Sequence, residues 1–350
     1  MRTLLAIVLL VISTPLFAES FPPVPALKPM PPAYLNAPGQ VVEVQSMPEG
    51  ITQGGLPICF GVTAWHLYQQ HVCKQAHSDC KHLDPKLTAS PLALSAMGIS
   101  SVFTSKYKTS KVIPYSTGGS VDSALFSLSG MDNIHADACY PWTKFAQKYH
   151  EDDRAMWKAF ENLRIRHYDK FKAEGKACID CLQDTLRRDF DLDVGKEKIE
   201  AALNEEVFEK FLYDIFLKDC KTKVEVGEFY EGGWPGPADD ISYAGFIGKL
   251  KKLISANTPV SASFCADRKT TSLGKGEACQ NPHIVVVFGY RQACAKGQCK
   301  DYMRVLNSWG KGWQAANSDG WMDAQNFYKY LDLGGVSVEW IAASANGTLR

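Results

Sequence analysis

The chain has 350 residues, of which 45% are hydrophobic and 22% charged, and its 38 basic residues balance its 38 acidic residues. A net charge of zero gives no indication of a nucleic-acid partner or of an anionic membrane, and the composition is that of a globular protein. Once an N-terminal leader is removed, about 330 residues remain, enough for one large domain or two ordinary ones.

The leader is residues 1–18, which are typical of a secretory signal peptide. A short basic start precedes an unbroken apolar run over 4–11, and the small residue Ala18 stands before Glu19. The run is too short to cross a bilayer, which takes about 20 apolar residues. We therefore expect a secreted or periplasmic protein with no membrane segment after cleavage.

The next elements in chain order are an extended segment and three helices. Residues 19–44 are rich in proline and predict an extended lead-in. Apolar residues at helical spacing predict a helix just after Cys59, over 60–72, a second over 87–97 and a short third over 123–129.

Residues 143–222 differ from their surroundings, because they are rich in charged residues and contain no proline. Apolar residues recur at helical intervals and predict several amphipathic helices. A glycine- and proline-rich stretch, 232–237, predicts a sharp break after this block. The apolar positions that carry the helical pattern are Trp157, Phe160, Leu163, Val207, Phe211 and Ile215.

The last third of the chain contains short runs of residues that favour strands. Helices, a helical block and strands follow one another in this order, which predicts an α+β fold with segregated halves. The expected strands are 259–264, 283–290, 302–306 and 336–340.

The cysteine count is odd, so an exported chain in which cysteines pair leaves one thiol over. We expect local disulfides Cys73–Cys80, Cys265–Cys279 and Cys294–Cys299. The eleven cysteines are 59, 73, 80, 139, 178, 181, 220, 265, 279, 294 and 299.

Two cysteine-containing segments admit a second interpretation. Cys178 and Cys181 have the spacing of a redox-active pair, but in a helical block we expect each to pair with Cys139 or Cys220. The crowding of histidines and cysteines over 66–82 could hold zinc, but the spacing fits no standard site. We favour a disulfide loop there, with solvated histidines.

One ordered set of residues has the chemistry of thiol-based acyl transfer. Such a reaction requires a thiolate, a base, a group that orients the base, and donors for the oxyanion. Cys59 stands just before a predicted helix, whose N-terminus lowers a thiol pKa, and Gln53 lies six residues upstream. His283 opens a run of β-branched residues, and Asn307 is followed two places on by Trp309.

In these residues the chain resembles the papain-like cysteine peptidases (the papain and cathepsin family), over roughly 45–142 and 240–345. Gln53 and Cys59 have the spacing of that family. The other matching segments, in order, are Gly118-Gly119, Tyr140-Pro141-Trp142, Pro259-Val260-Ser261, His283 with Phe288-Gly289-Tyr290, Asn307-Ser308-Trp309-Gly310 with Trp313, and Gly320-Trp321.

The resemblance implies a two-lobed fold, with a helical left lobe that carries Cys59 and a β-rich right lobe that carries His283 and Asn307. It implies a cysteine-type peptidase, a hydrolase in which Cys59 is the nucleophile, His283 the base, Asn307 its orienting partner and Gln53 an oxyanion donor. It implies a peptide or protein substrate, no cofactor or metal, no nucleic acid, and a monomer. The substrate would be bound by Gly118, Gly119, Ser263, Ile284 and Trp309.

The sequence also departs from the family. Before the nucleophile it has Leu56-Pro57-Ile58, and the bulky Ile58 is expected next to where the residue before the scissile bond would pass. Roughly 220 residues separate Cys59 from His283, about 80 more than is usual in the family. The block 143–222 accounts for the excess, which gives a peptidase domain over 45–350 interrupted by a helical insertion.

Two alternatives to a peptidase stay open. One is an acyl-transfer or cell-wall-peptide enzyme on the same scaffold, and the other is a non-catalytic peptide-binding relative. The insertion either limits access to the cleft or packs on the back of the protein.

Overall fold

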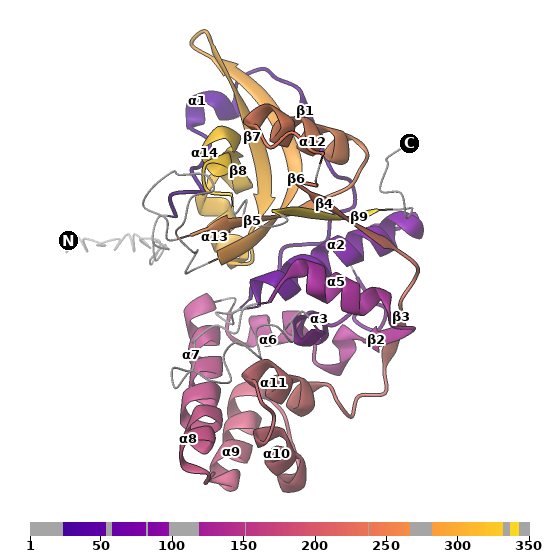
Figure 1. The fold of residues 1–350 in the computed structure, drawn as a ribbon. Coiled ribbons are helices and arrows are strands. Elements are labelled where there is room, and N and C mark those ends of the chain that lie inside the picture. Colours follow the sequence, from indigo (N-terminus) through magenta and orange to yellow (C-terminus); the bar gives the residue numbers. More distant parts are fainter. Residues whose placement is uncertain are drawn as a thin grey trace, which may run out of the picture.

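The computed structural model describes residues 24–53, 58–81, 83–97, 119–150, 152–236, 238–266, 282–331 and 337–342. These residues form helices and an antiparallel sheet, which confirms the expected α+β class. The sheet and the helical block lie at opposite ends of the molecule, with helix α2 (Cys59–Gln75) between them (Figure 1).

The sheet has seven strands, all paired antiparallel. Strands β6 and β7 form its long central hairpin, whose two turn residues, Lys296 and Gly297, both have positive φ. Glycine adopts that conformation without strain, which favours a two-residue turn. In spatial order the strands are β4 (Tyr230–Trp234), β9 (Val338–Ala342), β5 (Val260–Cys265), β6 (Pro282–Ala295), β7 (Gln298–Leu306) and β8 (Trp321–Asp323), and β1 (Val41–Glu43) adds to β6.

Both faces of strand β6 are covered, because successive side chains point to opposite faces. Ile284 and Val286 belong to a core shared with α2, whereas Val285 and Val287 belong to a core shared with α12 (Tyr243–Ser255). This arrangement explains the continuous apolar run in the sequence and fixes the start of β6 beside the start of α2.

The helices next to α2 are α3 (Pro91–Met97) and α5 (Val121–Ser129). Helices α2 and α3 approach so closely at Gly61 that a Cβ there would lie 2.1 Å from Ser95 Oγ. Helix α3 begins at Pro91 and not at residue 87 as expected, because proline favours an extended residue before it and suits the first helical position.

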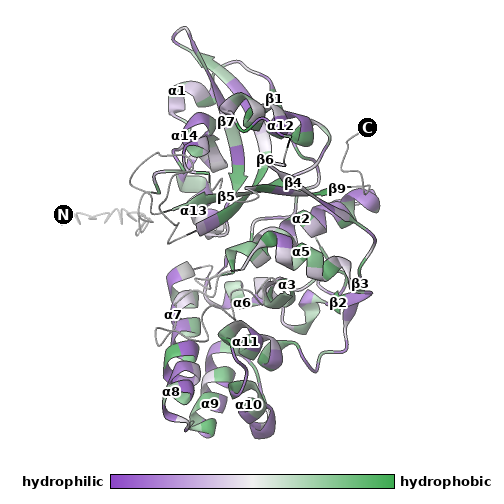
Figure 2. Ribbon diagram, viewed as in Figure 1, coloured by the Kyte–Doolittle hydropathy of each residue, from purple (hydrophilic) through white to green (hydrophobic). Residues whose placement is uncertain are grey.

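The helices predicted over 143–222 are present, as a chain of helices that packs against α3 through α11. Figure 2 shows hydrophilic and hydrophobic residues mixed along these helices, as amphipathic helices require. Their bounds are α6 (Trp142–Lys148), α7 (Asp153–Leu163), a π-helix (Arg164–Asp169), α8 (Lys170–Glu174), α9 (Ile179–Phe190), α10 (Lys196–Leu203) and α11 (Phe208–Phe216).

The apolar positions expected to be buried in these helices are buried, with one exception. Phe160, Leu163, Phe211 and Ile215 are buried, but Trp157 is 46% exposed, because the neighbouring Met156 takes the core position. No helix among the described residues is both long and apolar enough to cross a membrane.

The proline-rich segment packs against the sheet from residue 24 onward. Ala26, Leu27 and Met30 are buried, and the Met30 amide donates to the Trp321 carbonyl at 2.7 Å. A short helix, α1 (Pro32–Leu35), then leads into β1. The signal peptide expected over 1–18 lies outside the described residues.

The break expected over 232–237 is wrong for its first residues, which belong to β4. This strand pairs with β9, and Gly232 lies under the Trp340 indole, where a Cβ would meet the ring at 2.2 Å. The glycine therefore makes room for a tryptophan instead of ending the strand. The remaining elements are β2 (Asn133–His135), β3 (Lys223–Glu225), α13 (Gly310–Ala316) and α14 (Ala324–Tyr328), with 3-10 turns at Asp137–Cys139 and Ser318–Gly320.

The expected disulfides Cys73–Cys80 and Cys294–Cys299 are confirmed. Cys265 is also disulfide-bonded, and its expected partner, Cys279, lies outside the described residues. The expected pairing of Cys178 and Cys181 with Cys139 or Cys220 is wrong. Cys139 pairs with Cys220, and Cys178 pairs with Cys181, since the first turn of α9 brings their Cα atoms to 5.2 Å.

Candidate active site

Cys59 is the first residue of α2, and it is the one cysteine with a free thiol among the described residues. Burial raises the pKa of this thiol, whereas hydrogen bonds from the backbone amides of Ile284, Phe60 and Cys59 itself act to lower it. Two of these amides belong to the N-terminus of α2, which favours negative charge. The third belongs to β6 and brings the sulfur beside the residue that follows His283.

His283 is held on three sides near the start of β6. Its Nε2 lies 2.9 Å from Asn307 Oδ1, in the loop after β7. The Trp309 ring stacks on the imidazole at 4.6 Å between centroids and 20° between planes. Phe264, on strand β5, presents its edge at 5.5 Å and 87°. These contacts leave the imidazole little freedom to turn.

The hydrogen bond to Asn307 decides where the imidazole proton lies. An amide oxygen can only accept, so Nε2 carries the proton and Nδ1 keeps a lone pair. Burial lowers the pKa of His283 to about 4, opposed by the hydrogen bond to Asn307. At neutral pH His283 is therefore an uncharged base.

Asn307 is itself almost fully buried, with 2% of its surface exposed. Its amide nitrogen finds no hydrogen-bond acceptor among the described residues. The amide oxygen, which binds His283, thus provides the hydrogen bond that ties Asn307 to the cluster.

Gln53 is attached to the same loop by two hydrogen bonds with Ser308. Its backbone amide donates to the Ser308 carbonyl at 2.8 Å, and Ser308 Oγ donates to Gln53 Oε1 at 2.5 Å. Because the side-chain oxygen accepts from Ser308, the amide group of Gln53 is fixed with its NH₂ as the donor end. This is the end that an oxyanion requires.

These contacts bring four of the residues predicted from the sequence to one place. Asn307 binds His283, and the adjacent Ser308 binds Gln53, so the loop after β7 joins the base to the amide donor. Cys59 joins them through the Ile284 amide. A cysteine, a neutral imidazole, an orienting amide and a second amide donor thus converge where α2 meets β6.

The residues expected to bind substrate are placed in part. Ser263 and Ile284 are cross-strand neighbours on β5 and β6, and Gly119 lies two residues before the start of α5, which packs against α2. Trp309 covers the imidazole. Gly118 lies outside the described residues.

Ile58, expected next to the path of the residue before the scissile bond, presents no surface to solvent. Its side chain is fully buried in the core of the helical half, where a large apolar residue before α2 gains more by packing than by facing a cleft.

Two residues with a direct effect on this site were not singled out in the sequence. Ser308 holds Gln53, as described above. Trp142, at the start of α6, donates from Nε1 to the Thr52 carbonyl at 2.5 Å and so contacts the residue before Gln53. Both belong to matched segments, but nothing in the sequence indicates which distant residue each would touch.

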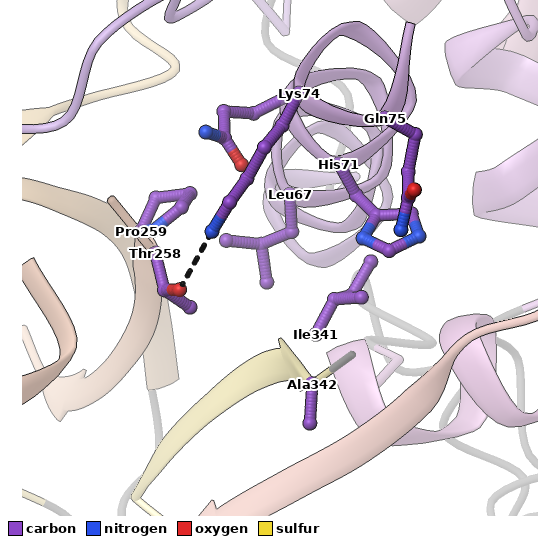
Figure 3. A pocket seen from close by; sticks show the side chains of 9 residues that line it. Leu67, His71, Lys74, Gln75, Thr258, Pro259, Ile341 and Ala342 are labelled. Carbon is purple, nitrogen blue, oxygen red and sulfur yellow. Dashed lines mark hydrogen bonds between the residues drawn. The ribbon is translucent and has the colours of Figure 1, made fainter. Parts of the chain in front are cut away.

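A small pocket lies between the C-terminal half of α2 and the sheet, away from Cys59 (Figure 3). Its volume is about 60 Å³, and Leu67 and Ile341 form its apolar walls. The Lys74 ammonium beside it donates to the carbonyls of Ala256 and Asn257, each at 3.0 Å. The Lys74 ammonium is hydrogen-bonded to carbonyls at the end of α12. We therefore interpret the pocket as a gap in packing and not as a charged binding site.

The zinc interpretation of the segment 66–82 has little support. Cys73 and Cys80 are joined in a disulfide, and His66 has its ring nitrogens against the carbonyls of Val62 and Glu49. The expectation of solvated histidines is wrong for His66 and His71, which are buried. Among the described residues, no group of three or more His, Cys, Asp or Glu is arranged to hold a metal ion.

No protein-family model matches this chain, and no curated protein matches it. Among solved structures, the chain is similar to the crystal structure of xylellain, a cysteine protease from Xylella fastidiosa. The two are 12% identical over 91% of this chain and 90% of that chain, with a TM-score of 0.41. A similarity of this size is not evidence of function. A functional proposal for this chain therefore has to rest on the side chains of the candidate site.

Proposed function

We propose that this chain is an exported cysteine peptidase with a two-lobed, papain-like fold. The observation that carries the proposal is the hydrogen bond between His283 Nε2 and Asn307 Oδ1, shielded by Trp309, next to the N-terminus of the helix that begins with the free Cys59. Peptide-bond hydrolysis by a thiol needs these groups in this order of contact.

The resting site holds a neutral thiol and a neutral imidazole. The pKa of Cys59 is raised and that of His283 is about 4, so neither is charged near pH 7. When a substrate carbonyl arrives, His283 Nδ1 takes the thiol proton and the sulfur attacks the carbonyl carbon. Asn307 stabilises the imidazolium that forms, because its oxygen accepts a charge-assisted hydrogen bond from the Nε2–H group.

The tetrahedral intermediate carries a negative oxygen that needs donors. The backbone N–H of Cys59 and the side-chain NH₂ of Gln53 are the two donors, and Ser308 holds Gln53 in place. Preorganised donors of this kind are each worth roughly 10²–10³ in rate. The bulk of the acceleration in the acylation step is therefore expected from the oxyanion donors together with the Cys–His pair.

The intermediate collapses when His283 gives its proton to the leaving amine, which leaves a thioester on Cys59. Water then attacks the thioester with His283 as the base, and the acid product departs as the thiol is protonated again. The proton taken from sulfur leaves with the amine and the proton taken from water goes back to sulfur, so the cycle balances without a cofactor.

The experiment is cleavage of a fluorogenic peptide library by the exported chain and by its Cys59→Ala variant. We expect turnover by the wild type and a loss of at least 10³-fold in Cys59→Ala with an unchanged melting temperature. Activity within tenfold of the wild type in a folded Cys59→Ala variant would refute the assignment. Turnover of cell-wall peptides with no cleavage of ordinary peptides would replace it by the acyl-transfer alternative.

A further inference from the structure

The disulfide Cys178–Cys181 spans the shortest sequence separation of the disulfides in the described residues. It closes a sequence separation of 3, whereas Cys139–Cys220 closes one of 81. A cross-link over so short a loop removes little entropy from the unfolded chain. Both cysteines are exposed. The bond is thus accessible to reagents and contributes little to holding the fold together.

The two sulfurs of this disulfide are not equivalent. Cys178 is the N-cap of α9 (Ile179–Phe190), and its sulfur accepts the backbone N–H of Cys181 at 3.3 Å. The amide and the helix dipole would stabilise a thiolate at Cys178. Of the two, Cys178 is therefore the better leaving group in thiol–disulfide exchange, and Cys181 is the sulfur that an incoming thiolate attacks.

Cys181 also borders a groove with a basic character. The groove has a volume of about 380 Å³ and lies between α9 and the π-helix Arg164–Asp169. Arg166, His167 and Arg188 line it together with one carboxylate, Asp184. Burial is the main cause that lowers the pKa of His167, and the charges of Arg166 and Arg188 lower it further, opposed by the charge of Asp189.

The carboxylates near the disulfide are already engaged. Asp180, which stands between the two cysteines, pairs with Lys196 at 2.5 Å. Asp184 faces Arg187 at 3.9 Å, and Asp189 pairs with Arg188. Arg166 makes no ion pair within the described part of the chain, which leaves its guanidinium available to an anion entering the groove.

We propose that Cys178–Cys181 is a redox-active disulfide that exchanges with small thiols carrying carboxylates, with Arg166 as their binding residue. The thiolate attacks Cys181 and forms a mixed disulfide, and Cys178 leaves as a thiolate. A second thiolate attacks the sulfur of the bound thiol, which yields the oxidised small disulfide and the reduced Cys178/Cys181 pair. Two electrons pass from two thiols to one disulfide, so no further reactant is needed.

The first test is equilibrium with reduced and oxidised glutathione at pH 7, followed by rapid alkylation and peptide mass mapping of the folded protein. We expect Cys178 and Cys181 to be reduced at glutathione ratios that leave Cys139–Cys220 intact. Reduction of both disulfides at the same ratio, or reduction only together with unfolding, would overturn the proposal.

The second test asks whether the disulfide reacts because thiols bind in the groove or only because its sulfurs are exposed. Reduction rates are compared between glutathione, which is anionic, and 2-mercaptoethanol, which is neutral. Arg166→Gln should slow the reaction with glutathione by about threefold or more and leave that with 2-mercaptoethanol unchanged. Lys210→Gln, a matched loss of one positive charge on α11, should slow neither. Equal effects of the two variants would refute the role of the groove.

The third test addresses the asymmetry of the two sulfurs, in a Cys59→Ala background that removes the other free thiol. Cys181→Ser leaves Cys178 alone at the N-cap, and its alkylation rate should half-saturate at a pH below about 7.5. Cys178→Ser leaves Cys181, which should titrate near the ordinary thiol pKa of about 8.5. Identical titrations would contradict the assignment. None of these outcomes depends on whether the chain is a peptidase.

Discussion

Trp142 joins helix α6 to the segment that carries Gln53, the proposed oxyanion donor, and Trp142→Phe tests that link. The indole is 2% exposed and donates to the Thr52 carbonyl at 2.5 Å, next to Gln53. Its ring also stacks on Phe160 of α7, at 5.8 Å and 20°. Phenylalanine keeps an aromatic ring in this core but removes the N–H donor.

The expected cost is worked from these contacts. Loss of one buried hydrogen bond costs about 0.5–1.5 kcal/mol, and the smaller ring loses roughly 1 kcal/mol of apolar burial. We therefore expect a free energy of unfolding about 2 kcal/mol lower. If Gln53 is displaced as a result, kcat should fall about tenfold, less than the roughly 10²–10³ that removal of a whole oxyanion donor costs, with little change in KM.

The assay is a double-mutant cycle on peptide cleavage, with Gln53→Ala as the second change. Trp142→Phe should lower kcat in the wild type and have almost no effect in the Gln53→Ala background. Phe160→Leu is the control, because it perturbs the same core and lies outside the hydrogen bond to Thr52. It should lower stability but not kcat. Additive effects of Trp142→Phe and Gln53→Ala would refute the coupling.

Three further predictions concern the base, a buried acid and a disulfide. The acid limb of the pH profile of kcat/KM should lie well below pH 6.5, because the pKa of His283 is about 4. Asn307→Ala should move this limb to still lower pH, since the hydrogen bond to Asn307 raises the pKa of His283. An acid limb at or above pH 6.5 would contradict this prediction. Burial raises the pKa of Asp137 to about 7 from 3.8, so the stability that its protonated form contributes is present at pH 3.8 and lost as the pH rises to 7. Asp137→Asn should thus gain up to roughly 4 kcal/mol relative to the wild type across that window in denaturant titrations, and a pH-independent difference would count against it. Removing Cys139–Cys220 by double alanine substitution should cost about 4.5 kcal/mol, given the separation of 81 residues; a loss below 1 kcal/mol by chemical denaturation would show that the loop is held by other contacts.

The fold was predictable where one local signal dominated. The unbroken apolar run that starts at His283 became a strand buried on both faces, and the amphipathic pattern around Phe211 became a helix of the insertion. Helix α12 (Tyr243–Ser255) was not anticipated, although Ser242 caps it and Phe246 and Leu250 lie on its buried face. The segments before and after it in the chain form a loop and a strand, so the helical pattern over these residues was too short to stand out.

Other features depend on contacts that local sequence does not encode. Gly232 sits in a strand only because Trp340 from β9 packs against it. The pairing of Cys178 with Cys181 depends on where α9 begins, and the sequence alone allows either cysteine to pair elsewhere. Tertiary packing decided the place of Gly232, and the exact start of α9 decided the pairing of Cys178 with Cys181.

The candidate site divides in the same way. Cys59, His283 and Asn307 were identifiable from their order and from the residues around them. Ser308 contacts Gln53 and Trp142 contacts Thr52 from segments far away in the chain, so these contacts depend on tertiary packing. Residue chemistry predicted the reaction that is proposed here, whereas the contacts that support Gln53 required coordinates.

Stoichiometric labelling with an irreversible thiol-directed epoxide tests the central claim most directly. The native, oxidised protein is titrated with the epoxide while residual peptide cleavage and the label on each cysteine are measured by mass mapping. We expect activity to fall in proportion to one label per molecule, on Cys59, and a His283→Ala variant to take up label far more slowly. Full activity after Cys59 is labelled, or a Cys59 that is found in a disulfide, would contradict the account.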